Sequence, residues 1–241
     1  MRFHYAASIS VACHLNLCYS KSLTGNCSAA GERMNEKFFD LKKEKQDRMI
    51  NAALKVFAQN GYRHASTDDI VHQASISKGL LFHYFDSKLG LYTFIYDYSV
   101  RYMTLELRSA VQKNQTDLFE LLKQQEQAKM QALRGYPYMQ QFLDRSMFED
   151  VSEALLAVGE KRSDIMAVYE NIFAQADMSL LPPGTDGGKI WKMLGLTVKG
   201  LMSEHFQESS FQAGMLYDEV CQYIDMVRKM VYGNDPETEL F

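Results

Sequence analysis

The chain has 241 residues, of which 46% are hydrophobic and 23% are charged. This composition is that of a globular protein, and it excludes wholesale disorder, collagen and coiled-coil fibres. No apolar run approaches the roughly 18 to 20 residues that cross a bilayer, so we expect no integral membrane protein and no membrane partner.

Charge is distributed unevenly along the chain. The net charge is -4, but residues 34–88 carry 9 basic and 7 acidic side chains, whereas residues 89–241 carry 14 and 22. A basic N-terminal part and an acidic C-terminal part indicate a small segment that binds a polyanion and a larger segment that does not.

The N-terminal stretch, residues 1–33, has no helical periodicity and holds three of the four cysteines. We predict that it is a disordered extension, and a true start of translation after it is an alternative that the sequence leaves open. No cysteine or histidine spacing typical of a zinc site occurs, so we expect no metal, no cofactor and no structural disulfide. These features favour a reducing, cytoplasmic location.

The first helix is expected over residues 42–60. Apolar residues recur there with helical spacing, and Gly61 follows where a C-terminal cap belongs. Its early turns carry basic side chains, which form either a solvated face or an approach to phosphate: Lys42, Lys43, Lys45 and Arg48.

Two short helices are expected next, separated by Ser75-Ile76-Ser77. Ser66 opens the first as an N-cap, with Asp69 completing an acidic variant of the capping box, and Ser77 caps the second, which ends near Tyr84. Two short helices with so tight a break cross steeply, which is helix-turn-helix geometry.

The rest of the chain also has helical periodicity, with breaks at residues 135–137, at Gly159 and at residues 182–188. No strand alternation is found, so the sequence predicts an all-α protein of about nine helices. The further helices are expected over residues 87–112, 116–134, 138–158, 163–178, 189–207 and 214–232.

The second short helix can lie in the major groove of DNA, which admits one helix. Leu81 and Phe85 are spaced to face a small core, which leaves the other residues of the helix toward the outside or its margins. Gly79 costs helix stability, and a close approach to a base pair would compensate for it.

The run from Ser77 to Lys88, Ser-Lys-Gly-Leu-Leu-Phe-His-Tyr-Phe-Asp-Ser-Lys, resembles the recognition-helix signature of TetR-family transcriptional regulators. The resemblance extends over about residues 45–92. It implies an N-terminal three-helix helix-turn-helix DNA-binding domain at residues 34–88. It also implies a helical C-terminal effector-binding and dimerisation domain at residues 89–241.

Carried over position by position, the resemblance separates residues that hold the phosphate backbone from residues that enter the groove. The phosphate set is Thr67, Ser77, Lys78, Tyr84 and Lys88. The groove set is Gly79, Leu80, Phe82 and His83.

Each of these residues, taken alone, has a structural interpretation that is about as good, but together in this spacing they favour DNA binding. His83 could be a surface histidine, Tyr84 could close the small core, and Lys88 could be an ordinary lysine at a helix start. The pattern departs from the family at the turn, where Ser75 replaces glycine at some backbone strain. It also departs at Leu80 and Phe82, which replace hydrogen-bonding residues and favour contact with thymine methyl groups.

The acidic part is rich in methionine and aromatic residues. Such stripes usually form the core, but the resemblance implies an effector pocket among the central helices, and a flexible apolar lining suits a hydrophobic small molecule. The expected lining residues are Met103, Phe119, Phe142, Met147, Phe148, Tyr169, Phe173 and Trp191.

The last two helices carry apolar stripes that can form an internal hairpin, whereas the TetR resemblance implies that they join the same pair of a second copy in a four-helix interface. The expected stripes are Leu194, Val198, Leu201 and Met202 on one helix, and Leu216, Val220, Tyr223, Val227 and Met230 on the other. We predict a homodimer that binds a palindromic double-stranded DNA operator.

The sequence therefore predicts a sequence-specific transcriptional regulator, a repressor released from its operator by a small hydrophobic effector. It predicts no enzyme, since the loop at residues 183–190 departs from a phosphate loop and no catalytic motif appears. The alternative is a helical module that binds a ligand or another protein without sequence-specific DNA binding.

Overall fold

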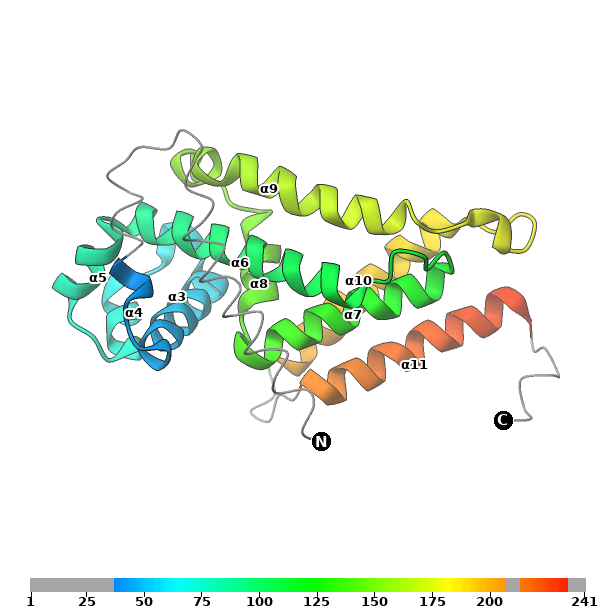
Figure 1. The fold of residues 1–241 in the computed structure, drawn as a ribbon, viewed down its shortest axis with the longest axis horizontal. Coiled ribbons are helices and arrows are strands. Elements are labelled where there is room, and N and C mark those ends of the chain that lie inside the picture. The colour runs from blue at the N-terminus through cyan, green and yellow to red at the C-terminus, as the bar shows by residue number, and fades with distance from the viewer. Residues whose placement is uncertain (1–36, 207–212, 234–241) are drawn as a thin grey trace. The chain divides into compact units, whose positions relative to one another are not determined.

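The computed structural model describes residues 37–206 and 213–233, so the extension predicted at residues 1–33 lies outside the described residues. The described part contains nine α-helices, one short 3-10 helix and three further helical residues at 37–39, without a strand, and the all-α prediction is confirmed (Figure 1). In chain order the elements are α3 (Lys43–His64), α4 (Thr67–Ala74), α5 (Lys78–Phe85), α6 (Lys88–Ala110), α7 (Leu118–Gly135), α8 (Met139–Ser146), α9 (Ser152–Phe173), η1 (Met178–Leu180), α10 (Gly187–His205) and α11 (Ala213–Tyr232).

The chain divides into two compact units. Unit 1 takes the described residues of Met1–Leu105 together with Ala132–Met166, and unit 2 takes Glu106–Gln131 with those from Ala167 onward. The chain therefore passes from one unit to the other within α6, α7 and α9. The assignment of separate functions to residues 34–88 and 89–241 remains a prediction.

Helix α3 is the centre of unit 1. The apolar residues that predict it, Met49, Ala53 and Phe57 among them, are all buried. At Gly61 the backbone takes φ 68 and ψ 177, which interrupts the helix before a last turn that ends at His64. A positive φ favours glycine, so the predicted stop signal acts at the predicted residue.

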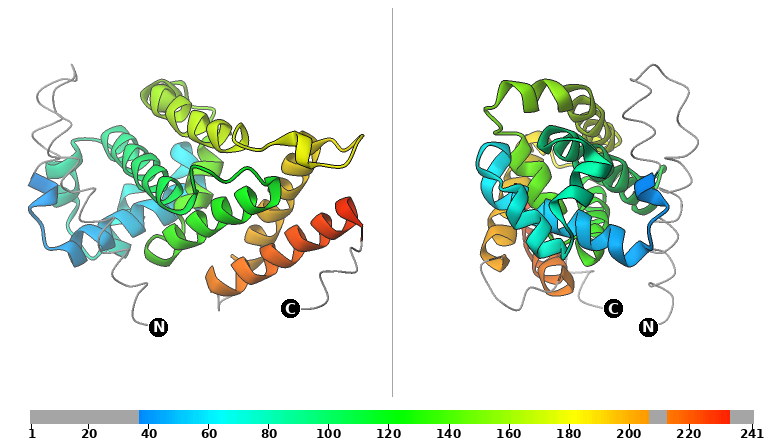
Figure 2. Two further views of the ribbon diagram at one scale, coloured as in Figure 1. Left: turned by 45° about the vertical axis from the view of Figure 1, so that its right-hand side comes forward. Right: turned by 90° about the vertical axis from the view of Figure 1, so that its left-hand side faces the viewer.

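Helix α4 packs against α3, and α5 packs against α4; the three helices lie close together in Figure 2. An aromatic cluster fixes α5 there. Phe38 is fully buried, and its ring lies 5.3 Å from that of Phe85 and 5.1 Å from that of Phe94 on α6. The residues just before α3 therefore complete the core on which α5 rests.

One predicted helix break is wrong. The sequence places it at Gly159, but α9 runs continuously through Gly159, and the break lies at residues 147–151. Helix α8 ends in bonds from the N–H groups of Met147, Phe148 and Glu149 to the carbonyls three residues before them. The next two N–H groups are bound by Glu149. Its carboxylate accepts hydrogen bonds from the backbone N–H groups of Asp150 at 3.1 Å and Val151 at 3.2 Å, and such local bonds compete with helix continuation.

Unit 2 is held by contacts between α7 and α11 and between α9 and α10. Arg228 donates to the carboxylates of Asp117 and Glu120 at 3.2 and 2.8 Å. The rings of Phe173 and Trp191 lie 5.2 Å apart, edge to face. Within the part of the chain that the structure covers, no helix has both the length and the apolar character needed to span a membrane.

Candidate nucleic-acid interface

The two short helices begin and end where the sequence predicts. The Ser66 hydroxyl accepts from the backbone N–H groups of Asp68 and Asp69 at 3.2 and 3.3 Å, and that of Ser77 accepts from Leu80 at 3.2 Å. Between them, Ser75 takes the left-handed conformation, with φ 53 and ψ 52. A serine thus occupies the backbone region that favours glycine, as its position in the turn predicts.

The inner faces of α4 and α5 form the small core with α3. Ile70 and Ala74 on α4 and Leu81 and Phe85 on α5 are buried, which confirms the predicted core-facing spacing. Burial of these residues determines which side of α5 faces solvent.

The solvent-facing side of α5 carries the residues that the resemblance assigns to the groove. Lys78, Gly79 and His83 are exposed, and Leu80 and Phe82 are half-buried. A Cβ atom added at Gly79 would meet no atom within 4 Å, so nothing within the described protein requires a glycine there.

Tyr84 departs from the expected surface position. It is 8% exposed, and its ring lies 5.9 Å from that of Phe38, edge to face. The ring of Tyr84 therefore helps to close the small core, which was the structural alternative to a phosphate contact. Contact of the Tyr84 hydroxyl with a phosphate remains a prediction.

The residues assigned to phosphate differ in their surroundings. Thr67 is half-buried and Ser77 is exposed. Lys78 Nζ lies 2.8 Å from a carboxylate oxygen of Asp68, and both side chains are largely exposed. Water screens such a pair, so Lys78 can exchange Asp68 for a phosphate at little cost.

Lys88 is held more firmly. Its Nζ donates to the Arg63 carbonyl oxygen at 3.2 Å and lies 4.8 Å from the centre of the Tyr62 ring. Burial lowers the pKa of Lys88 against the opposing effect of Glu149 and Glu153. Lys88 therefore fastens the start of α6 to the end of α3, and any role at phosphate is additional.

A carboxylate pair completes this junction. Glu149 accepts from the backbone N–H of Tyr62 at 2.9 Å, and Glu153 accepts from the Tyr62 hydroxyl at 2.7 Å. Burial and the hydrogen bond to Glu153 raise the pKa of Tyr62 to about 12. The end of α3 is thus fixed to the start of α9.

A second junction, not found from the sequence, links α3 to α6 and to the turn between α7 and α8. The hydroxyl groups of Tyr98 and Tyr136 lie 2.7 Å apart, and Tyr136 donates to Asp47 at 2.7 Å. Lys43 also donates to both Asp47 and Tyr136. Lys43 therefore belongs to this junction, which weighs against the phosphate role considered for it.

We expect this junction to make the protein sensitive to alkaline pH. Burial raises the pKa of both Tyr98 and Tyr136, so the folded protein holds protons that an unfolded chain releases near pH ~10. Its stability is fully present below that pH and falls as the pH rises above it. Urea unfolding between pH ~8 and ~11, followed with tyrosinate absorbance, checks this; a flat profile would contradict it.

The eight residues expected to line an effector pocket are divided equally between unit 1 and unit 2. In unit 1, Phe142 packs its ring against Phe57, Tyr92 and Tyr96, and Met103 is fully buried. Met147 is half-buried, and Phe148 is 83% exposed.

In unit 2, Phe119 is fully buried, with Tyr232 against its ring, and Tyr169 is half-buried, with Lys129 against its ring. Phe173 and Trp191 form the half-buried pair already described. An effector pocket built from these residues remains a prediction.

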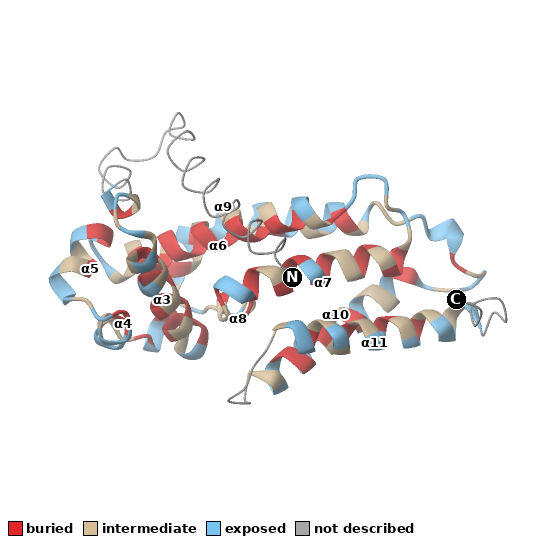
Figure 3. Ribbon diagram, turned by 60° about the horizontal axis from the view of Figure 1, so that its bottom comes forward, coloured by how far each residue is buried: buried red, intermediate tan, exposed pale blue. Residues whose placement is uncertain are grey.

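The stripes on α10 and α11 are partly buried within unit 2. The four expected residues of α10 are buried, as are Leu216, Val220 and Val227 of α11, whereas Tyr223 is 37% and Met230 72% exposed. Ile224 fills the internal contact in their place. Both helices show buried and exposed faces in Figure 3.

Comparisons with known proteins point to one family. Residues 49–93 match the model of the bacterial regulatory proteins of the tetR family. The chain is 34% identical over 111 residues to the uncharacterized HTH-type transcriptional regulator YuxN of Bacillus subtilis (strain 168), covering 41% of the chain and 38% of that protein. It is 34% identical over 68 residues to the HTH-type transcriptional activator FasR of Mycolicibacterium smegmatis, covering 28% of the chain and 31% of that protein. The chain thus spans about a third of the length of these relatives.

Solved structures share the fold over a larger part of the chain. A TetR family transcriptional regulator from Chloroflexus aurantiacus superposes with a TM-score of 0.58 at 23% identity, covering 81% of this chain and 95% of that one. The fatty acid degradation regulator FadR from Bacillus halodurans gives 0.55 at 18% identity, covering 76% and 96%. The helix-turn-helix segment of the chain thus matches the tetR family model, and the chain shares its fold with solved TetR family regulators.

Proposed function

We propose that the protein is a sequence-specific DNA-binding transcriptional regulator. The observation that carries the proposal is α5, whose inner face is packed into the small core while Lys78, Gly79 and His83 face solvent. An exposed helix of this size fits the major groove. Footprinting on genomic DNA tests the proposal, with protected palindromes as the expected result and uniform cleavage as the contrary one.

Lys78 is expected to contribute to binding without reading sequence. Lys78→Ala should weaken binding to operator and random duplex alike. It should also lower the slope of log K against log salt concentration by about 0.9, because one phosphate contact is lost. Lys113→Ala is the control, since Lys113 is an exposed lysine of the link between α6 and α7. An unchanged slope in Lys78→Ala would count against the phosphate assignment.

A homodimer is proposed through the exposed faces of α10 and α11. Leu196 is 62% exposed and Met226 is 45% exposed, and large apolar residues concentrated on exposed helix faces favour association. Light scattering at micromolar concentration should give a dimer, and Leu196→Glu with Met226→Glu should give a monomer. A monomeric unmodified protein would refute the interface.

The direction of control is proposed to be repression relieved by a small hydrophobic effector. The proposal of repression rests on the family resemblance. The relative FasR, in contrast, is named an activator. A reporter gene behind the footprinted operator decides between the two. Deletion of the regulator should raise its expression, and a fall in expression would establish activation instead. We propose with this function a cytoplasmic location and a role without catalysis.

A further inference from the structure

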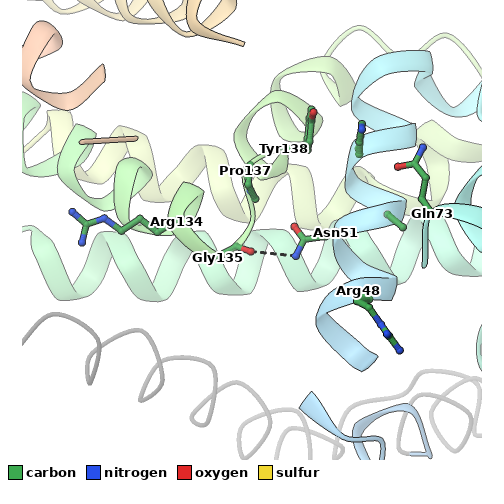
Figure 4. Close-up of a pocket in the computed structure, with 9 residues that line it drawn as sticks. Arg48, Asn51, Gln73, Arg134, Gly135, Pro137 and Tyr138 are labelled. Atoms are coloured by element: carbon green, nitrogen blue, oxygen red, sulfur yellow. Dashed lines mark hydrogen bonds between the residues drawn. The ribbon is translucent and has the colours of Figure 1, made fainter. Parts of the chain in front are cut away.

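Unit 1 contains a cleft of about 440 Å³ that the DNA-binding role does not explain (Figure 4). Its wall is formed by α3, by the end of α4 and by the turn between α7 and α8. The residues that matter for its chemistry are Arg48, Asn51, Lys55, Gln73, Arg134 and Tyr138.

The cleft is basic. Arg48, Lys55 and Arg134 line it, and no carboxylate does. None of the three forms an ion pair with another residue that the structure describes. Like charges around one hollow repel one another, and an anion between them removes that repulsion.

The backbone adds to the positive potential. Helix α8 begins at the wall of the cleft, because its N-cap residue Tyr138 is part of the lining. No side chain caps this helix start. The Met139 N–H already donates to the Tyr136 carbonyl oxygen at 3.0 Å, so the remaining N–H groups of the first turn are the ones that favour negative charge.

Asn51 supplies a further requirement. Its Nδ2 donates to the Gly135 carbonyl oxygen at 3.2 Å, which fixes the orientation of the amide, because the flipped amide would set two oxygens together. Its Oδ1 is buried and accepts from no group in the described part of the chain. A ligand reaches this atom only if the lining shifts to uncover it, and it must then bring a hydrogen-bond donor.

The arginine side chains lie at the rim. In Figure 4 the guanidinium groups of Arg48 and Arg134 point away from the bond between Asn51 and Gly135. Both residues are exposed. Exposed side chains change rotamer on the picosecond to nanosecond scale, so both groups can turn toward a bound anion.

From these features we infer that the cleft binds a small organic anion that carries a carboxylate or phosphate group and at least one hydroxyl. Its volume lies in the range of small-molecule sites. It is separate from the expected effector pocket, since none of the eight residues expected there lines it.

A ligand in the cleft would strengthen the junction at which Tyr136 contacts Asp47. The turn that supplies Gly135 and Tyr138 also holds Tyr136, whose hydroxyl donates to Asp47 on α3. Arg48 follows Asp47 directly. An anion bridging Arg48 and Arg134 would therefore tie α3 to this turn at a second point.

Isothermal titration calorimetry tests the cleft in the absence of DNA. A negative result would therefore overturn the anion site without bearing on the proposed DNA-binding function. The probes are citrate, which has carboxylates and a hydroxyl, and inorganic phosphate, at ionic strength held constant with sodium chloride. Citrate should bind, and more tightly than phosphate. Arg48→Gln with Arg134→Gln should weaken citrate binding about tenfold or more, because two charge-assisted contacts are lost.

The matched control is Lys37→Gln with Lys113→Gln, which removes the same charge from two exposed positions outside the cleft. It should bind citrate as the unmodified protein does. Arg134→Gln alone gives a second, milder variant, with an intermediate affinity expected.

Three results would overturn the inference. These are no citrate binding by the unmodified protein, equal loss in the cleft variant and its control, and unchanged affinity in the cleft variant. A cleft variant that loses affinity only for DNA would instead place Arg48 and Arg134 in the nucleic-acid interface.

Discussion

Replacing Phe142 by alanine is expected to lower the free energy of unfolding by about 3–5 kcal/mol. Phe142 is 1% exposed, and its ring lies 6.1 Å from that of Phe57 on α3 and 5.5 Å from that of Tyr92 on α6. The substitution leaves a cavity where α8 meets these two helices. The folded protein loses the free energy gained by transferring the ring from water to the core, and it also loses the packing contacts of the ring.

The chain supplies a matched control only six positions away. Phe148 is 83% exposed, so Phe148→Ala should change stability by less than about 0.5 kcal/mol. Urea unfolding followed by circular dichroism measures both variants. Equal losses would mean that α8 does not pack on α3 as described.

Replacing Gly79 by leucine is expected to separate stability from function. Nothing lies within 4 Å of a Cβ placed there, and glycine is a poor helix former. The variant should therefore be as stable as the unmodified protein, or more stable by up to about 1 kcal/mol. On DNA the added side chain would occupy the space of the closest approach, which should weaken operator binding about 10- to 150-fold.

Gly159 provides the control for this effect. It is an exposed glycine of α9 with open space around its Cβ position. Gly159→Leu should gain helix stability in the same way and keep its affinity for the operator. Fluorescence anisotropy with a labelled operator compares the two. Full affinity in Gly79→Leu would remove Gly79 from the interface.

The helix-turn-helix part could be predicted from the sequence because its signals are local. Ser66 and Ser77 act on N–H groups two or three residues ahead, and Gly61 interrupts α3 through its own φ angle. Each signal sits within one turn of the boundary that it sets. Neighbouring residues along the chain therefore contain enough information to place α3, α4 and α5.

The junctions could not be predicted because their partners are far apart in sequence. Tyr136 contacts Asp47, 89 positions away, and Glu149 contacts the backbone N–H of Tyr62, 87 positions away. The misplaced break at Gly159 has a different origin, because the bonds at the true break are local. Glycine is tolerated within α9, whereas the chain between α8 and α9 is held by bonds of Glu149 to the next two N–H groups, for which the residue type gives no signal.

Aromatic residues on the central helices were the least informative signal. The same residue type serves the core at Phe142 and faces solvent at Phe148, and helical spacing alone does not separate the two. For Tyr84 the choice was between a surface and a core position, and the ring of Phe38 decides it.

The affinity ratio between the footprinted operator and a scrambled duplex tests the central claim most directly. Both dissociation constants should be measured at physiological salt, on protein whose circular dichroism spectrum shows that its helices are folded. We expect a ratio of about 10³ or more, the range of specific regulators. A ratio near one would contradict it, because α5 would then present no base-reading surface.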